Sequence, residues 1–212
     1  MDVEPADAKE RRLRRLALQL EWGTNAWNVM EVVVTVSLGL MAGSLALIAF
    51  GLDSLVEVFA STVVIWHLRD DGPDPDDHRT HRALRLIAAA FFTLSLYLLV
   101  ASSRSLIVGN QPGDSPIGIA YLFVTACVMF GLAYSKRRVA RDMGSETVGR
   151  EAAMTFLDGC LSVGILTALV MNSVFGWWWA DAVAAFGVGV YAAREGVVSW
   201  RQGAPHGSVT PP

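Results

Sequence analysis

The sequence predicts an all-α integral membrane protein, a six-helix transmembrane bundle with both termini in the cytoplasm. Apolar residues make up 53% of the 212 residues, the mean hydropathy is +0.41, and charged residues are only 17%. The charges are concentrated between long apolar runs, as a bilayer requires. Basic residues return at every second connection, which indicates the side of the membrane on which each connection lies.

The first apolar stretch, residues 25–68, is far too long for one crossing at about 1.5 Å of rise per residue. We expect it to break at MAGS (41–44), which gives spans at 25–42 and 44–68. Segments rich in proline, glycine or charge bound the later spans, which are expected at 83–108, 117–135, 151–172 and 177–194.

Three segments describe the domain organisation. Residues 1–23 form a basic cytoplasmic or interfacial N-terminal segment, whose sequence KERRLRRLALQLEW (9–22) is typical of an amphipathic helix lying on the cytoplasmic leaflet. Residues 24–198 form the six-span transmembrane domain, with a polar connector at 135–150. Residues 199–212 are short and rich in proline and glycine, so we expect a disordered tail.

The distribution of basic residues predicts the orientation. Sixteen of the seventeen lysines and arginines precede the first span, lie at the connection after the second, or follow the fourth and the sixth. Only Arg104 lies near the other side. The positive-inside rule therefore places both termini and these connections in the cytoplasm.

Five acidic residues lie within the predicted spans: Glu31, Asp53, Glu57, Asp158 and Asp181. Asp53 and Glu57 are one helical turn apart, so their mutual repulsion would be about 2–3 kcal/mol at an effective dielectric constant near 20. A charged carboxylate at the bilayer centre costs about 2.5–3.5 kcal/mol more. A proton, a metal cation or basic partners must offset these terms. The set predicts a cation site, although neutral acids hydrogen-bonded between helices remain an alternative, above all for Glu31 and Asp181.

The connection RDDGPDPDDHRTHR (69–82) offers a possible second metal site. His78, His81 and Asp77 supply the imidazole and carboxylate donors that zinc prefers. Arg79 and Arg82 would repel a cation, so a solvated acidic loop is an equally good interpretation.

Four short motifs carry a resemblance to a known family: WNVME (27–31), DSLVE (53–57), FLDGCLS (156–162) and GWWWADAVAAFGVGVYAAREG (176–196). With six spans, the chain resembles the cation diffusion facilitator family, in its short form without the cytoplasmic C-terminal domain. The resemblance implies export of a divalent cation in exchange for protons. Zn²⁺ is the expected substrate, with Mn²⁺ or Fe²⁺ as alternatives, and no resident cofactor is expected. It also implies a homodimer and a multi-pass location in the inner or plasma membrane of a bacterium.

The resemblance further implies which residues hold the metal. Asp53 and Glu57 match the ligand pair of span two, and Asp158 matches one ligand of span five. Met154 stands where the family usually has histidine or aspartate, so Glu31, Thr155 or a water would complete the shell. Asp181 matches a further acid of span six.

Two other functions remain open from the sequence. The first is a non-transporting membrane protein, a metal-binding or partner subunit built on the same bundle. The second is an intramembrane aspartyl hydrolase that would pair Asp53 with Asp158. No zinc-protease, serine-hydrolase or phosphate-loop motif is present, so an enzyme is not expected, and nothing favours nucleic-acid binding.

Overall fold

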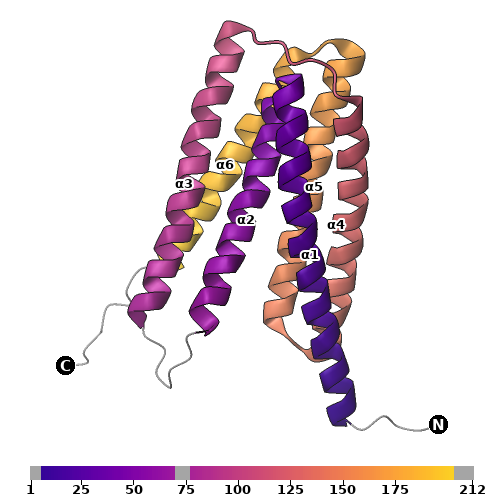
Figure 1. Cartoon of the computed structure of the whole chain (residues 1–212), viewed down its shortest axis with the longest axis vertical. Helices are drawn as coiled ribbons and strands as arrows, with labels where there is room; N and C mark the ends of the chain where they lie inside the picture. The colour runs from indigo at the N-terminus through magenta and orange to yellow at the C-terminus, as the bar shows by residue number, and fades with distance from the viewer. Residues whose placement is uncertain (1–5, 70–76, 203–212) are drawn as a thin grey trace.

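The computed structural model describes the backbone of residues 6–69 and 77–202, which forms six long α-helices and the turns between them. The helices are α1 (Ala6–Ala42), α2 (Leu45–Arg69), α3 (Asp77–Val108), α4 (Pro116–Met143), α5 (Glu146–Phe175) and α6 (Trp178–Gln202). They run side by side in alternating directions, so α1 begins and α6 ends at the same end of the bundle (Figure 1). We call this end, which also holds the α4–α5 turn at Gly144, the basic end.

The expected helix positions are confirmed, with one clear error at 135–150. This segment is not a polar connector, because α4 continues to Met143 and only Gly144 and Ser145 separate it from α5. Lysine and arginine are good helix formers, and no helix breaker occurs before Gly144. Gly144 ends α4 in the left-handed conformation (φ 63°), and Ser145 caps α5 by accepting a hydrogen bond from the backbone N–H of Val148.

The basic segment 9–22 is helical, as expected, and it is continuous with the rest of α1 (Figure 1). Its place on the cytoplasmic leaflet stays a prediction. At the other end, α6 reaches Gln202, so the expected tail is helical in its first residues. Residues 203–212 lie outside the described part. The connection 69–82 is also shorter than expected, because α3 already begins at Asp77.

Within the described residues, four helical stretches are long and apolar enough to cross a membrane. They are Arg11–Ala42, Leu84–Val108, Pro116–Met143 and Glu151–Phe175. Helices α2 and α6 are not among them. The count of six spans and the cytoplasmic position of both termini therefore stay predictions.

The outer surface of the bundle is apolar, and its interior holds polar side chains beside a hydrophobic core. Large apolar side chains such as Leu96, Ile107 and Phe123 are exposed on its surface, whereas many hydroxyl and carboxyl side chains are buried between the helices. Lipid solvates apolar surface at little cost, and buried polar groups hydrogen-bond to one another. This arrangement is the one expected of a surface that contacts lipid.

Close helix packing positions α2 against α1. The two helices join at Gly43 (φ 66°) and cross closely at Gly51. A Cβ added at Gly51 would lie 2.4 Å from Thr35 Oγ1 and 2.6 Å from Val36 Cγ2, so no larger residue fits without a shift. This crossing holds the acidic turn of α2, Asp53–Glu57, against the middle of α1. The other extensive pairings are α3 with α6 and α4 with α5.

Candidate metal site

The bundle brings four of the five predicted intramembrane acids together in its interior. We call this group, Glu31 of α1, Asp53 and Glu57 of α2 and Asp158 of α5, the acid cluster. Glu31, Asp53 and Asp158 are buried and Glu57 is half-buried. The cluster thus joins acids from three helices that are far apart in the sequence.

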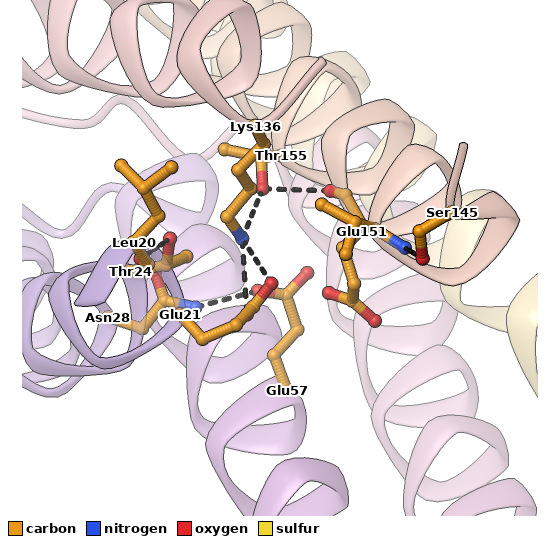
Figure 2. A network of polar contacts seen from close by, with 10 residues as sticks. Leu20, Glu21, Thr24, Asn28, Glu57, Lys136, Ser145, Glu151 and Thr155 are labelled. Atoms are coloured by element: carbon orange, nitrogen blue, oxygen red, sulfur yellow. Dashed lines mark hydrogen bonds and ion pairs between the residues drawn. The ribbon is translucent and has the colours of Figure 1, made fainter. Parts of the chain in front are cut away.

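Two polar side chains connect the acids of α1 and α2. Asn28 Nδ2 donates a hydrogen bond of 3.0 Å to Glu57 Oε2 (Figure 2). The Ser54 hydroxyl donates to Glu31 Oε1. Both bonds depend on the close helix crossing at Gly51, and together they orient one carboxylate from each helix.

Across the bundle, Glu57 of α2 and Asp158 of α5 lie close enough to interact electrostatically. Two ionised carboxylates repel each other, so a proton or a cation would stabilise the pair. Asp53 lies one turn from Glu57 and interacts electrostatically with Glu57, Glu31 and Glu195. The cluster therefore concentrates acidic groups between α1, α2 and α5.

Some oxygens of the cluster are left without donors. Among the described residues, Asp53 Oδ1 and Glu31 Oε2 are buried and have no hydrogen-bond partner. Within that same part of the chain, no three side chains of His, Cys, Asp or Glu converge as a ready set of metal ligands. A cation bound here would draw the carboxylates together. The ligand roles of Asp53, Glu57, Asp158 and Glu31 stay predictions.

Thr155 lies one turn before Asp158 and is buried, but its hydroxyl already has two partners. It donates to the backbone oxygen of Glu151 (3.0 Å) and accepts from Lys136 Nζ (3.1 Å), as Figure 2 shows. A metal ligand cannot keep an ammonium group at this distance. Thr155 would have to lose Lys136 before it could bind a metal.

Lys136 is the residue that sequence reasoning placed wrongly. We counted it with the basic residues of a cytoplasmic connector, yet its side chain is 1% exposed and forms an ion pair of 3.2 Å with Glu21 of α1. A signal was present, since Met129, Ala133, Lys136 and Ala140 follow the three-to-four spacing of one buried helix face. The charge of Lys136 masked this pattern.

Asp181 lies at the other end of the bundle and has a structural role. Its carboxylate accepts hydrogen bonds from the Ser44 hydroxyl and from the backbone N–H groups of Leu45 (2.8 Å) and Ala46 (3.3 Å). These donors belong to the first turn of α2, where backbone N–H groups have no partner within the helix. The geometry favours the structural alternative that the sequence left open for Asp181.

The remaining expected positions are less informative. Met154 is 43% exposed, so it does not point into the acid cluster. His78, His81 and Asp77 belong to the first turns of α3, but their side chains lie outside the described part of the structure. A second metal site there stays a prediction.

The chain is similar to a known family of membrane proteins. Residues 26–202 match the model of the cation efflux transmembrane domain. The magnetosome protein MamB of Magnetospira sp. (strain QH-2) is 25% identical over 191 residues, which cover 87% of this chain and 65% of MamB. The cation-efflux pump FieF of Salmonella typhi is 29% identical over 154 residues, 70% of this chain and 51% of FieF. The chain thus spans about half to two thirds of these relatives. It is a multi-pass membrane protein that belongs to the cation efflux, or cation diffusion facilitator, family.

Proposed function

We propose that this protein exports divalent metal cations from the cytoplasm in exchange for protons, with Zn²⁺ as the main substrate. The observation that carries the proposal is the gathering of Glu31, Asp53, Glu57 and Asp158, acids of three helices, in the interior of the bundle. Membership of the cation efflux family supports metal transport, and FieF is named as a cation-efflux pump.

The chemistry of the acid cluster suits exchange between a metal and protons. A divalent cation between Asp53, Glu57 and Asp158 cancels their repulsion, and it must displace any protons that these carboxylates hold. Glu31, Thr155 or a water would supply a further oxygen. Such an all-oxygen site binds Zn²⁺ more strongly than Mn²⁺ or Fe²⁺ but discriminates among them poorly, so these two ions are further candidate substrates.

The transport cycle then follows from alternating access. With the cluster open to the cytoplasm, the carboxylates lose protons and bind the metal. After the bundle opens to the other side, protons displace the metal and the protonated protein returns. FieF and MamB come from bacteria, so we propose the bacterial inner membrane as its location and a homodimer as its assembly.

The experiment is zinc flux into vesicles that contain the purified full chain. With an acidic interior and Zn²⁺ outside, proton efflux should drive zinc uptake, and an ionophore that removes the pH gradient should stop it. Protein-free vesicles and an Asp158→Asn variant are the controls. A well-folded protein without flux would refute the proposal. Retained zinc binding in that protein would favour a non-transporting partner subunit.

A further inference from the structure

Lys136 is a buried cation at the basic-end side of the acid cluster. Its side chain extends from α4 into the space between α1 and α5, where its ammonium group meets one residue from each (Figure 2). Nζ lies 3.2 Å from both carboxylate oxygens of Glu21 and 3.1 Å from Thr155 Oγ1. With 1% exposure, Lys136 is as buried as any acid of the cluster.

A buried charge of this kind needs partners, because desolvation of an ammonium group costs several kcal/mol, on the order of the cost of a buried carboxylate. Glu21 supplies one negative charge but is itself 35% exposed. Glu151 of α5, on the basic-end side of Thr155, also interacts electrostatically with Lys136. Further inward, the next negative charges belong to the acid cluster. Asp158 lies three residues after Thr155, on the same helix face, and feels the charge of Lys136.

Lys136 also lies near the route by which a metal ion from the basic end would reach the acid cluster. Helix α5 runs inward from the basic end, so Thr155 lies between that end and Asp158. In α2, which runs the opposite way, Glu57 is the acid nearest the basic end. The ammonium group of Lys136, which is bonded to Thr155, therefore lies beside the path from the basic end to Glu57 and Asp158.

We infer that Lys136 is a tethered cation that competes with the transported metal for the acid cluster, and that Glu21 controls this competition. The inference rests on the proposed function. When no metal is present, the ammonium group of Lys136 neutralises part of the negative charge of the acid cluster and donates a hydrogen bond to Thr155. A dication entering the cluster is repelled by Lys136, which must then leave Thr155 and keep only its contact with Glu21. Lys136 thus acts as a positioning residue that sets metal affinity, and it is not itself a ligand.

The two partners of this ion pair should change metal affinity in opposite directions. Lys136→Met removes the competing charge and keeps the length of the side chain, so Zn²⁺ and Mn²⁺ should bind at least about tenfold more tightly. Glu21→Gln removes the charge that draws the ammonium group away from the cluster, so both ions should bind about threefold or more weakly. A merely structural contact would weaken binding in both variants.

Isothermal titration calorimetry of the full chain in detergent, with ZnCl₂ and with MnCl₂, measures these affinities. Lys136→Arg keeps the charge and should not bind metal more tightly than the wild type. Arg138→Gln is the matched control, because it removes a positive charge from the same helix at an exposed position, where solvent screens it. Its affinity should change by less than about twofold.

The outcomes separate this inference from the proposed function. If the wild type binds and transports zinc but a folded Lys136→Met protein binds it no more tightly, the competition is refuted and the transport proposal stands. If Lys136→Met does not fold, Glu21→Gln decides, and unchanged or tighter metal binding there refutes the competition. If the wild type binds neither ion, both proposals fail.

Discussion

Buried acids occur at both ends of this bundle, and their surroundings differ. Asp181, away from the basic end, accepts hydrogen bonds from the Ser44 hydroxyl and from two backbone N–H groups of α2. In the acid cluster, Glu57 accepts from Asn28, and within the described part of the chain Asp53 Oδ1 and Glu31 Oε2 have no donor. Asp181, Asp53 and Glu31 are all at most 3% exposed.

The difference shows that depth in a membrane does not by itself identify a functional acid. A carboxylate whose oxygens are occupied by fixed donors stabilises the fold and has little left to offer a cation. A carboxylate with open oxygens, next to other acids, is costly until a proton or a metal joins it. The number of donors therefore separates Asp181 from the acid cluster.

The largest effect on zinc flux is expected from substitutions in the acid cluster. Asp53→Ala, Glu57→Ala and Asp158→Ala should each lower zinc flux by about a hundredfold or more, since a lost ligand costs more than a lost ligand-orienting contact. The amount of protein in the membrane should not fall, because removing a buried acid eases insertion. Flux into vesicles, normalised to folded protein, measures this. Near-normal flux in Asp158→Ala would remove that residue from the site.

At Asp181, a substitution is expected to lower the stability of the protein and to leave zinc flux unchanged. Asp181→Ala leaves the N–H groups of Leu45 and Ala46 and the Ser44 hydroxyl without their acceptor, so the free energy of unfolding should fall by about 1–3 kcal/mol. Flux per folded molecule should be retained. Thermal unfolding in detergent gives the stability, with Asp181→Asn, which keeps one acceptor oxygen, as the milder control. A stable variant without flux would give Asp181 a transport role.

The pH dependence of metal binding tests whether the open oxygens hold protons. A metal binds to deprotonated carboxylates. Lowering the pH protonates these groups, so metal binding should weaken as the pH falls from 8 to 6. Displacement of one proton gives about a tenfold loss of affinity per pH unit. Calorimetry in two buffers with different ionisation enthalpies also counts the protons released. Affinity that does not change over this range would exclude proton exchange at the cluster.

The smallest effect is expected at Met154. This side chain is 43% exposed, so an imidazole there would not reach the acid cluster from its present position. Met154→His should change the ratio of zinc to manganese uptake by less than about twofold, whereas a ligand in the site would favour zinc more strongly. Competition uptake with both ions measures the ratio. A clear shift toward zinc would mean that residue 154 faces the cluster during transport.

Much of the fold could be predicted because apolar runs and breakers are local signals. Gly43, Pro116 and Gly176 mark the helix ends that the sequence indicates, and the acids stand out within apolar runs. The end of α4 could not be placed in the same way, because the basic residues of 136–141 look like a connector although they favour a helix.

The surroundings of the candidate site were harder to predict than its acids. Glu21 lies 115 residues from Lys136, and neither residue shows by itself that the other will neutralise it. The donors of Asp181 lie in α2, more than 130 residues away. Sequence spacing indicates which residues share a helix face, but pairing between helices depends on the packing of the whole bundle.

The two-residue turn at Gly144 and Ser145 limits how the bundle can move. Such a short connection, with extensive packing along its two arms, makes α4 and α5 a single hairpin with almost no internal freedom. Lys136 and Thr155 lie on opposite arms within three turns of the bend, so their separation is nearly fixed. Glu21 lies on α1, outside this hairpin. Any rotation of α1 against the hairpin would therefore stretch the Lys136–Glu21 contact before the Lys136–Thr155 contact.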